Sequence, residues 1–107
     1  MKIPVDAIIP EPKLTLYLLV FKSRNDKSQF LAQAGFTLSN WQTLKIAIQE
    51  LNQSVEAVRD RSNEYGTFYN VCGELKGVNG VNLSVVTVWL KRQSDGKFQF
   101  ITLKPGD

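Results

Sequence analysis

The sequence predicts an α+β domain in which N-terminal helices pack on one face of a C-terminal antiparallel β-sheet of three to four strands. Apolar residues recur at steps of three and four through residues 41–58, which is the period of an amphipathic helix. After Asn63 the spacing changes to that of strands separated by glycine-containing turns. With 107 residues, 43% of them hydrophobic, and no segment typical of a linker, we expect residues 1–107 to form a single domain.

A short helix is expected near the N-terminus. Pro12 suits the first position of a helix through residues 13–19, because its fixed φ is helical and no hydrogen bond is lost there. The spacing of Leu14, Tyr17 and Leu18 favours this helix. Alternation of Leu14, Leu16 and Leu18 also fits a strand, so this alternative stays open.

A second short helix is expected after the polar segment at residues 22–27. Asn25 or Asp26 is available to cap its N-terminus. Gly35 is expected to end the helix in the left-handed conformation, which places Phe36 against Leu31 as in a Schellman motif.

The third helix has the clearest pattern. Ser39 and Gln42 are spaced as a capping box, and the apolar stripe that follows predicts about five turns. The stripe consists of Trp41, Leu44, Ile48, Leu51, Val55 and Val58. Glu50, Glu56 and Asp60 are expected to face water.

The C-terminal half predicts an antiparallel meander. Residues 67–72 favour a strand, and the Asn-Gly pair within residues 77–80 is a strong hairpin signal. Residues 82–92 are apolar on both faces, so we place this strand in the middle of the sheet. A turn at residues 94–96 then leads into the last strand, residues 98–103.

The composition excludes several classes of site. The chain has no histidine and one cysteine, so it has no internal disulfide, no cysteine-rich metal site and no histidine base. Cys72 is expected to be a small buried residue on a strand. We expect neither a metal nor a cofactor. The single cysteine fits a reducing compartment, which predicts a cytoplasmic protein. No apolar run is long enough for a membrane span and no secretory leader is evident, so we expect no membrane partner.

The net charge of +3 is unevenly distributed. Basic residues dominate residues 13–27 and 76–104, whereas acidic residues dominate the region between them. A basic surface on the sheet side would attract phosphate. A mixed, solvated surface is the simpler alternative.

Several aromatic and polar side chains are candidates for one nucleic-acid interface. By strand parity, Thr87, Trp89 and Lys91 share a face of the central strand. Phe100 and Thr102 share a face of the next strand. If these faces coincide, they form a patch with Tyr69 beside the loop that carries Arg24 and Lys27. Ordinary core packing of the aromatic residues remains the alternative.

A set of short motifs extends over nearly the whole chain. They are Lys13-Leu14-x-x-Tyr17-Leu18-Leu19, Asn25-Asp26-Lys27-x-x-Phe30, Gly35-Phe36, Tyr65-Gly66-x-x-Tyr69, Gly73-x-Leu75-x-Gly77-x-Asn79-Gly80, Val85-x-Thr87-x-Trp89 and Thr102-Leu103-x-Pro105. Together they resemble a bacterial family of unknown function that is common in cyanobacteria. That family looks like toxin domains of the barnase/EndoU/colicin/RelE-like ribonuclease superfamily.

The match to the toxin domains is incomplete. These domains often carry His-Pro-x-Gly-Arg-x-Lys before a helix, where this chain has residues 22–27, which keep the final Lys27 but lack the histidine. An arginine that they often carry is replaced here by Val86.

The resemblance implies metal-free cleavage of RNA by the neighbouring 2′-hydroxyl group. The catalytic residues would be Lys27, Thr87 and Thr102. Lys27 would stabilise the charge of the transition state, and the two threonines would bind phosphate oxygens. The substrate-binding residues would be Arg24, Tyr69 and Trp89. Proton transfer would fall to Lys27 or Tyr69.

Two other kinds of partner stay open. The domain is alternatively a non-catalytic interaction module, such as one half of a toxin–antitoxin-like pair with a small acidic protein. The last strand is a potential edge through which a homodimer would form, although Lys97 and Lys104 flank it and would guard it against pairing.

Overall fold

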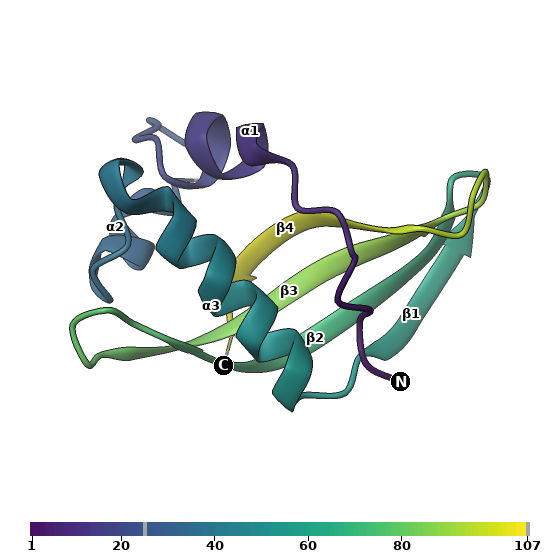
Figure 1. Cartoon of the computed structure of the whole chain (residues 1–107). Helices are drawn as coiled ribbons and strands as arrows, with labels where there is room; N and C mark the ends of the chain where they lie inside the picture. Colours follow the sequence, from purple (N-terminus) through teal and green to yellow (C-terminus); the bar gives the residue numbers. More distant parts are fainter. Residues whose placement is uncertain (25, 107) are drawn as a thin grey trace.

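The computed structural model describes residues 1–24 and 26–106. Helices that precede the sheet in sequence cover one face of a four-stranded antiparallel β-sheet (Figure 1), so the predicted fold class is confirmed. The strands are β1 (Val58–Asn63), β2 (Gly66–Lys76), β3 (Asn82–Arg92) and β4 (Phe98–Pro105), in the spatial order β1-β2-β3-β4. The interior position predicted for residues 82–92 is confirmed.

The first helical segment, residues 11–18, forms a helix and not the strand that the sequence left open. It begins as α1 (Glu11–Lys13) and continues as a π-helical turn, η1 (Leu14–Leu18). Leu14 and Leu18 are fully buried, whereas Leu16 is exposed, as expected for a helix with one face toward the core. The helical alternative for this segment is therefore confirmed.

The second helix, α2 (Ser28–Ala32), has the predicted C-terminal end but a different N-terminal one. Asp26 Oδ1 accepts hydrogen bonds from the Ser28 backbone N–H (3.1 Å) and hydroxyl (2.7 Å), but the N-cap residue is Lys27, which has no side-chain cap, so the prediction of Asp26 as the N-cap is wrong. Asn25, the other candidate, lies outside the described residues. Gly35 has φ +85°, and the Phe36 N–H donates to the Leu31 carbonyl at 3.2 Å, so the Schellman motif is confirmed.

The third helix differs from the prediction at both ends. A 3₁₀ turn, η2 (Leu38–Asn40), precedes α3 (Trp41–Ser54), and its capping box is formed by Thr37 and Asn40. The predicted box of Ser39 and Gln42 is therefore wrong, because the turn starts two residues earlier.

The predicted end of this helix near residue 58 is also wrong. The chain leaves the helix at Val55, whose φ of −126° and ψ of 137° are extended. Val58 pairs with Asn70 as the first residue of β1. Glu56 lies outside the helix and forms an ion pair with the N-terminal amino group at 2.8 Å. Pairing of β1 with β2 therefore takes the place of the last helical turn that the sequence predicted.

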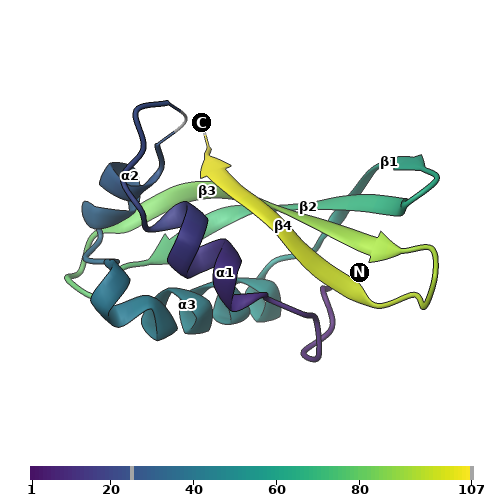
Figure 2. The same cartoon turned by 90° about the horizontal axis from the view of Figure 1, so that it is seen from above.

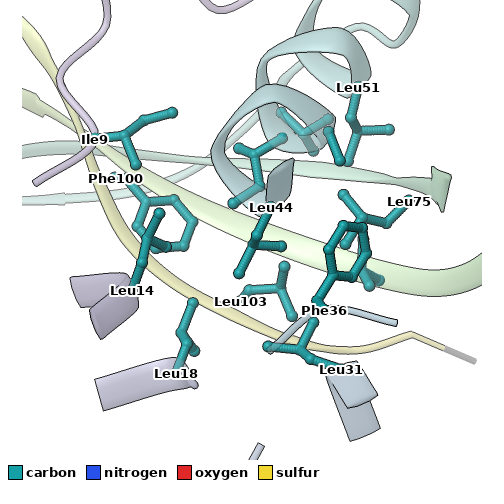
Figure 3. Close-up of a cluster of buried hydrophobic side chains, with 14 of the residues drawn as sticks. Ile9, Leu14, Leu18, Leu31, Phe36, Leu44, Leu51, Leu75, Phe100 and Leu103 are labelled. Carbon is teal, nitrogen blue, oxygen red and sulfur yellow. The ribbon is translucent and has the colours of Figure 1, made fainter. Parts of the chain in front are cut away.

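The core lies between the helices and the inner face of the sheet. Figure 3 shows Leu14, Leu18 and Leu31 pointing toward Phe100 and Leu103 of β4, with Leu44 between them. All six side chains are fully buried. Truncating such a leucine to alanine costs about 2–5 kcal/mol of the free energy of unfolding. This core fixes the first helical segment and α2 against β4.

The N-terminal segment lies beside the start of β4. The Ile8 N–H donates to the Phe98 carbonyl, and the Phe100 N–H donates to the Ile8 carbonyl, both at 2.8 Å, so that Ile8 forms a parallel bridge with Gln99. Part of the edge through which a homodimer would form is therefore occupied by the same chain.

The other face of the sheet carries Cys72, which is exposed. Its register partner is Val86, and both alternate with core-facing neighbours such as Val71 and Val85. The prediction that Cys72 is buried is wrong, because the strand turns this position away from the helices. Within the described part of the chain, no helix is long and apolar enough to cross a membrane.

Candidate functional site

A β-bulge divides the patch that strand parity predicts. Thr87 pairs with Leu103 and Trp89 pairs with Phe100, but the intervening Val88 pairs with Thr102. One extra residue in β4 reverses the direction of the side chains that follow it. Phe100 therefore faces the core, whereas Thr102 faces away from it, and the expectation that they share a face is wrong.

Thr87 and Trp89 form a polar pair inside the core. Both residues are 0% exposed. The Trp89 Nε1–H donates to Thr87 Oγ1 at 2.9 Å, and the indole packs edge-on against Phe100 at a centroid distance of 5.4 Å. A buried indole N–H needs an acceptor, which the threonine supplies. Neither side chain reaches a ligand at the surface.

Tyr69 lies opposite Trp89 in the pairing of β2 with β3, whereas Arg24 lies apart from both. Tyr69 is partly buried on the core-facing side of β2, where it packs against Phe98 at a centroid distance of 5.4 Å. Arg24 is exposed in the loop before α2. The structure therefore places two of the three predicted substrate-binding residues, Tyr69 and Trp89, side by side on the core-facing side of the sheet and leaves Arg24 away from them.

The structure does bring Lys27 and Thr102 together. Lys27 Nζ donates to Thr102 Oγ1 at 3.0 Å, in a partly buried contact between residues that are 75 positions apart. The polar loop before α2 lies beside the C-terminal half of β4 (Figure 2), and the hydrogen bonds of Ser28 to Asp26 hold the turn that contains Lys27. This lysine–threonine pair is the centre of the candidate site.

Tyr17 completes the site, although sequence reasoning did not assign it a functional role. The Lys22 Nζ lies 3.7 Å from the centroid of the Tyr17 ring, and the Nζ atoms of Lys27 and Lys13 lie at 5.5 and 5.8 Å. We refer to Tyr17, Lys22, Lys27 and Thr102 as the tyrosine–lysine cluster. It concentrates positive charge around one phenol.

The cluster perturbs the acidity of the phenol. Burial raises the pKa of Tyr17, but the positive charge of Lys27, hydrogen bonds with Thr102 and Lys27, and the charge of Lys22 together outweigh it. The pKa therefore lies below the ordinary value of 10.0. Negative charge on this oxygen is favoured because cations surround it.

One signal for Tyr17 was present in the sequence. Tyr17 belongs to the same motif as Lys13 and precedes Lys22 by five positions, so a helix followed by a returning loop brings a phenol near several cations. Helical spacing alone assigns Tyr17 to the core-facing stripe. The π-helical turn instead leaves it partly exposed.

Other features of the molecule lie away from this cluster. A cavity of about 320 Å³ lies between the N-terminal segment and α3, and its lining includes Val5, Ile46 and Asn52. Asn52 Oδ1 is buried without a hydrogen-bond partner. In the described residues, no three His, Cys, Asp or Glu side chains converge as metal ligands would. None of the residues that line this cavity belongs to the tyrosine–lysine cluster.

The fold resembles that of a chain in a solved toxin–immunity protein complex. A chain of the contact-dependent growth inhibition toxin–immunity protein complex from Klebsiella pneumoniae 342 superposes with a TM-score of 0.72. The alignment covers 95% of each chain at 17% sequence identity, which shows a shared fold.

Comparison of the sequence with models of protein families identifies a domain family of unknown function. No curated protein matches the chain. The profile of one domain family matches residues 4–107, and so extends over both the tyrosine–lysine cluster and the sheet. The chain belongs to the family described as the domain of unknown function DUF6883.

Proposed function

We propose that this domain is a toxin-like endoribonuclease that binds RNA at the tyrosine–lysine cluster and cleaves it without a metal. The observation that carries the proposal is the contact of Lys27 with Thr102 beside a phenol of lowered pKa. A hydroxyl group, two ammonium groups and a phenol of lowered pKa in one partly exposed site are suited to a phosphodiester.

Phosphate binding follows from the arrangement of donors. Lys22 and Lys27 supply ammonium groups, and Thr102 supplies a hydroxyl donor that can turn toward an incoming oxygen. The contact between Lys27 and Thr102 is partly buried, so charge interactions there are stronger than in bulk water. An RNA phosphate would replace the present hydrogen bond of Lys27 with one to its own oxygen.

The cleavage step uses Tyr17 as the base and Lys27 as the acid. The Tyr17 phenolate takes the proton of the 2′-hydroxyl group, whose oxygen forms a bond to the adjacent phosphorus. The bond from phosphorus to the 5′-oxygen breaks, and Lys27 donates a proton to that oxygen. The products are a 2′,3′-cyclic phosphate and a 5′-hydroxyl group, and a proton passed from Tyr17 to Lys27 restores both groups.

Two further observations support the proposal. The fold is similar to that of a chain in a toxin–immunity complex, which supports a toxin-like role. The active residues all come from the first helical segment, the loop before α2 and β4, which the core packs together. Thr87 and Trp89 have no part in this mechanism, because both are buried.

The test compares wild-type protein, Lys27→Ala and Lys97→Ala on labelled RNA in the presence of EDTA. Lys97 is a matched control, since it is an exposed lysine at the opposite end of β4. We expect cleavage by wild type and Lys97→Ala, and a loss of at least about tenfold in Lys27→Ala. RNA with 2′-deoxy substitutions should not be cleaved. Equal background cleavage by all three proteins would overturn the proposal.

A second candidate function is a non-catalytic interaction module that binds a small acidic protein. The similarity to a chain in a toxin–immunity complex and the net charge of +3 favour it. It predicts stoichiometric binding of the product of an adjoining gene, measured by titration calorimetry, together with no RNA cleavage. Binding that is unchanged in Lys27→Ala would place the protein contact outside the tyrosine–lysine cluster.

A further inference from the structure

The sheet has a face that none of the described helices covers (Figure 1). On this outer face three pairs of neighbours face solvent: Phe68 with Leu90, Asn70 with Val88, and Cys72 with Val86. Phe68, Leu90, Val88 and Val86 are only partly buried. An apolar strip of this kind, on an otherwise polar surface, marks a binding face.

One end of the strip carries a stacked pair of side chains. The guanidinium carbon of Arg61, on β1, lies 5.0 Å from the centroid of the Phe68 ring. Arg61 is exposed and Phe68 is partly exposed. Aromatic rings and guanidinium planes are the two side-chain surfaces on which nucleobases stack in single-stranded RNA.

The stacked pair is within reach of the tyrosine–lysine cluster. Thr102 pairs with Val88, whose other neighbour is Asn70, so this row lies one step along the same face from the row of Phe68 and Leu90. Two residues along a strand and two strands across correspond to about 12 Å. A strand of RNA held by its phosphate at Thr102 therefore reaches Phe68 with a nearby base.

We infer that Phe68 and Arg61 form a base-stacking platform for the single-stranded RNA whose phosphate the tyrosine–lysine cluster holds. The inference rests on the proposed function and names the form of its substrate. Charge favours this occupant, because Lys76, Arg61 and Lys104 on and around the outer face outnumber Glu74 and Asp60. Tyr69 and Trp89 cannot take this role, because strand alternation turns them toward the core.

The experiment separates binding from cleavage. Fluorescence anisotropy measures the affinity of labelled oligoadenosine and oligouridine in which 2′-O-methyl groups prevent cleavage. The proteins are wild type, Phe68→Ala, Phe68→Trp, Lys27→Ala and the control Leu38→Ala, which removes an exposed apolar side chain on η2. Thermal unfolding checks that each variant is folded.

Phe68→Ala should weaken binding about tenfold. Phe68→Trp should retain wild-type affinity, and Leu38→Ala should bind as wild type. Since purines stack more strongly, the preference of wild type for oligoadenosine should shrink in Phe68→Ala. A structural role alone would not alter that preference.

Two outcomes would overturn the inference. If Lys27→Ala weakens RNA binding but neither Phe68 variant changes affinity or base preference, the cluster binds RNA without this platform and the proposed function stands. If wild type binds neither oligonucleotide, both the platform and the proposed function are wrong. In either case, loss of binding to the product of an adjoining gene in Phe68→Ala would assign the outer face to a protein partner.

Discussion

Thr87 and Thr102 carry the same hydroxyl group, and the structure gives them opposite environments. Thr87 accepts a hydrogen bond from the buried indole N–H of Trp89. Thr102 accepts a hydrogen bond from the ammonium group of Lys27 in a partly buried contact. Register explains the difference, because Thr87 faces the helices and Thr102 follows the bulge in β4. Thr87 therefore satisfies a buried polar group in the core, and under the proposed function Thr102 is the threonine that binds phosphate.

Replacing each threonine by valine should separate these roles. Thr87→Val leaves the Trp89 N–H buried without a partner and should lower the free energy of unfolding by about 1–3 kcal/mol. Thr102→Val should cost no more than about 1 kcal/mol but should reduce RNA cleavage. Chemical denaturation and the cleavage rate per folded molecule test both. A stable, inactive Thr87→Val protein would contradict the assignment.

Tyr17 should ionise at a lower pH than an unperturbed tyrosine. Its pKa is lowered, whereas that of an unfolded tyrosine is 10.0, so the folded chain releases this proton at lower pH. Between the two pKa values the unfolded state binds more protons, and the free energy of unfolding should therefore rise with pH in that window. Cleavage should rise over the same range if the phenolate is the base.

Ultraviolet titration of phenolate absorbance tests this prediction. Tyr17→Phe should lose the ionisation that occurs below the ordinary tyrosine pKa of 10.0, and Lys22→Gln should raise the pKa of Tyr17 toward that value. Ionisation of Tyr17 at or above pH 10.0 would show that the lysines do not stabilise its phenolate.

Among the structural elements, the turn between β2 and β3 supports α2. The Val78 N–H donates to the Ala34 carbonyl at 2.9 Å, and Asn79 Nδ2 donates to the Gln33 carbonyl at 3.1 Å. Both acceptors lie at the C-terminal end of the segment that begins at Lys27. The turn thus holds one end of the helix while β4 holds the other.

Gly77 is essential to that contact. A Cβ at this position would overlap the Val81 carbonyl oxygen and lie 2.6 Å from the Cβ of Ala34. Gly77→Ala should therefore lower the free energy of unfolding by about 3 kcal/mol. At Gly80, which has open space and φ +87°, alanine should cost only about 1 kcal/mol. Denaturant unfolding of both variants measures the difference, and equal losses would contradict this account.

The helices, the main strands and the turns were predictable because each depends on neighbours in sequence. The Schellman end at Gly35 and the central strand at residues 82–92 are examples. β1 was not predicted, since Val58 continues the helical spacing and only pairing with Asn70 makes it a strand.

The site was predicted in part for the same reason. Lys27 and Thr102 were identified as separate candidates, and the structure brings them together. The bulge in β4 was not predictable, because Phe98, Phe100 and Thr102 alternate as in a regular strand. The acidity of Tyr17 depends on a loop that returns along β4, a contact that periodicity does not describe.

For the whole molecule, the distribution of charge determines how RNA would bind. Arg24, Lys22 and Lys27 lie in one loop at one end of the molecule, whereas Glu50 and Glu56 lie on and after α3. A basic end on a protein of net charge +3 steers a polyanion toward the cluster.

Binding of single-stranded RNA should therefore fall with salt. If Lys22, Lys27 and Arg24 each neutralise one phosphate, affinity should drop roughly 20-fold between about 50 and 200 mM salt. Anisotropy titrations at several salt concentrations measure the slope, and Lys27→Ala should reduce it by about one phosphate. Affinity independent of salt would mean that phosphate is not the ligand.

The exposed thiol of Cys72 makes the uncovered side of the sheet directly observable. Because the chain has no second cysteine, a maleimide dye would attach at one known position without prior mutagenesis. Such a dye lies beside Val86, two residues from Asn70 along β2. The emission of the dye would report, in real time, when a ligand binds to that surface.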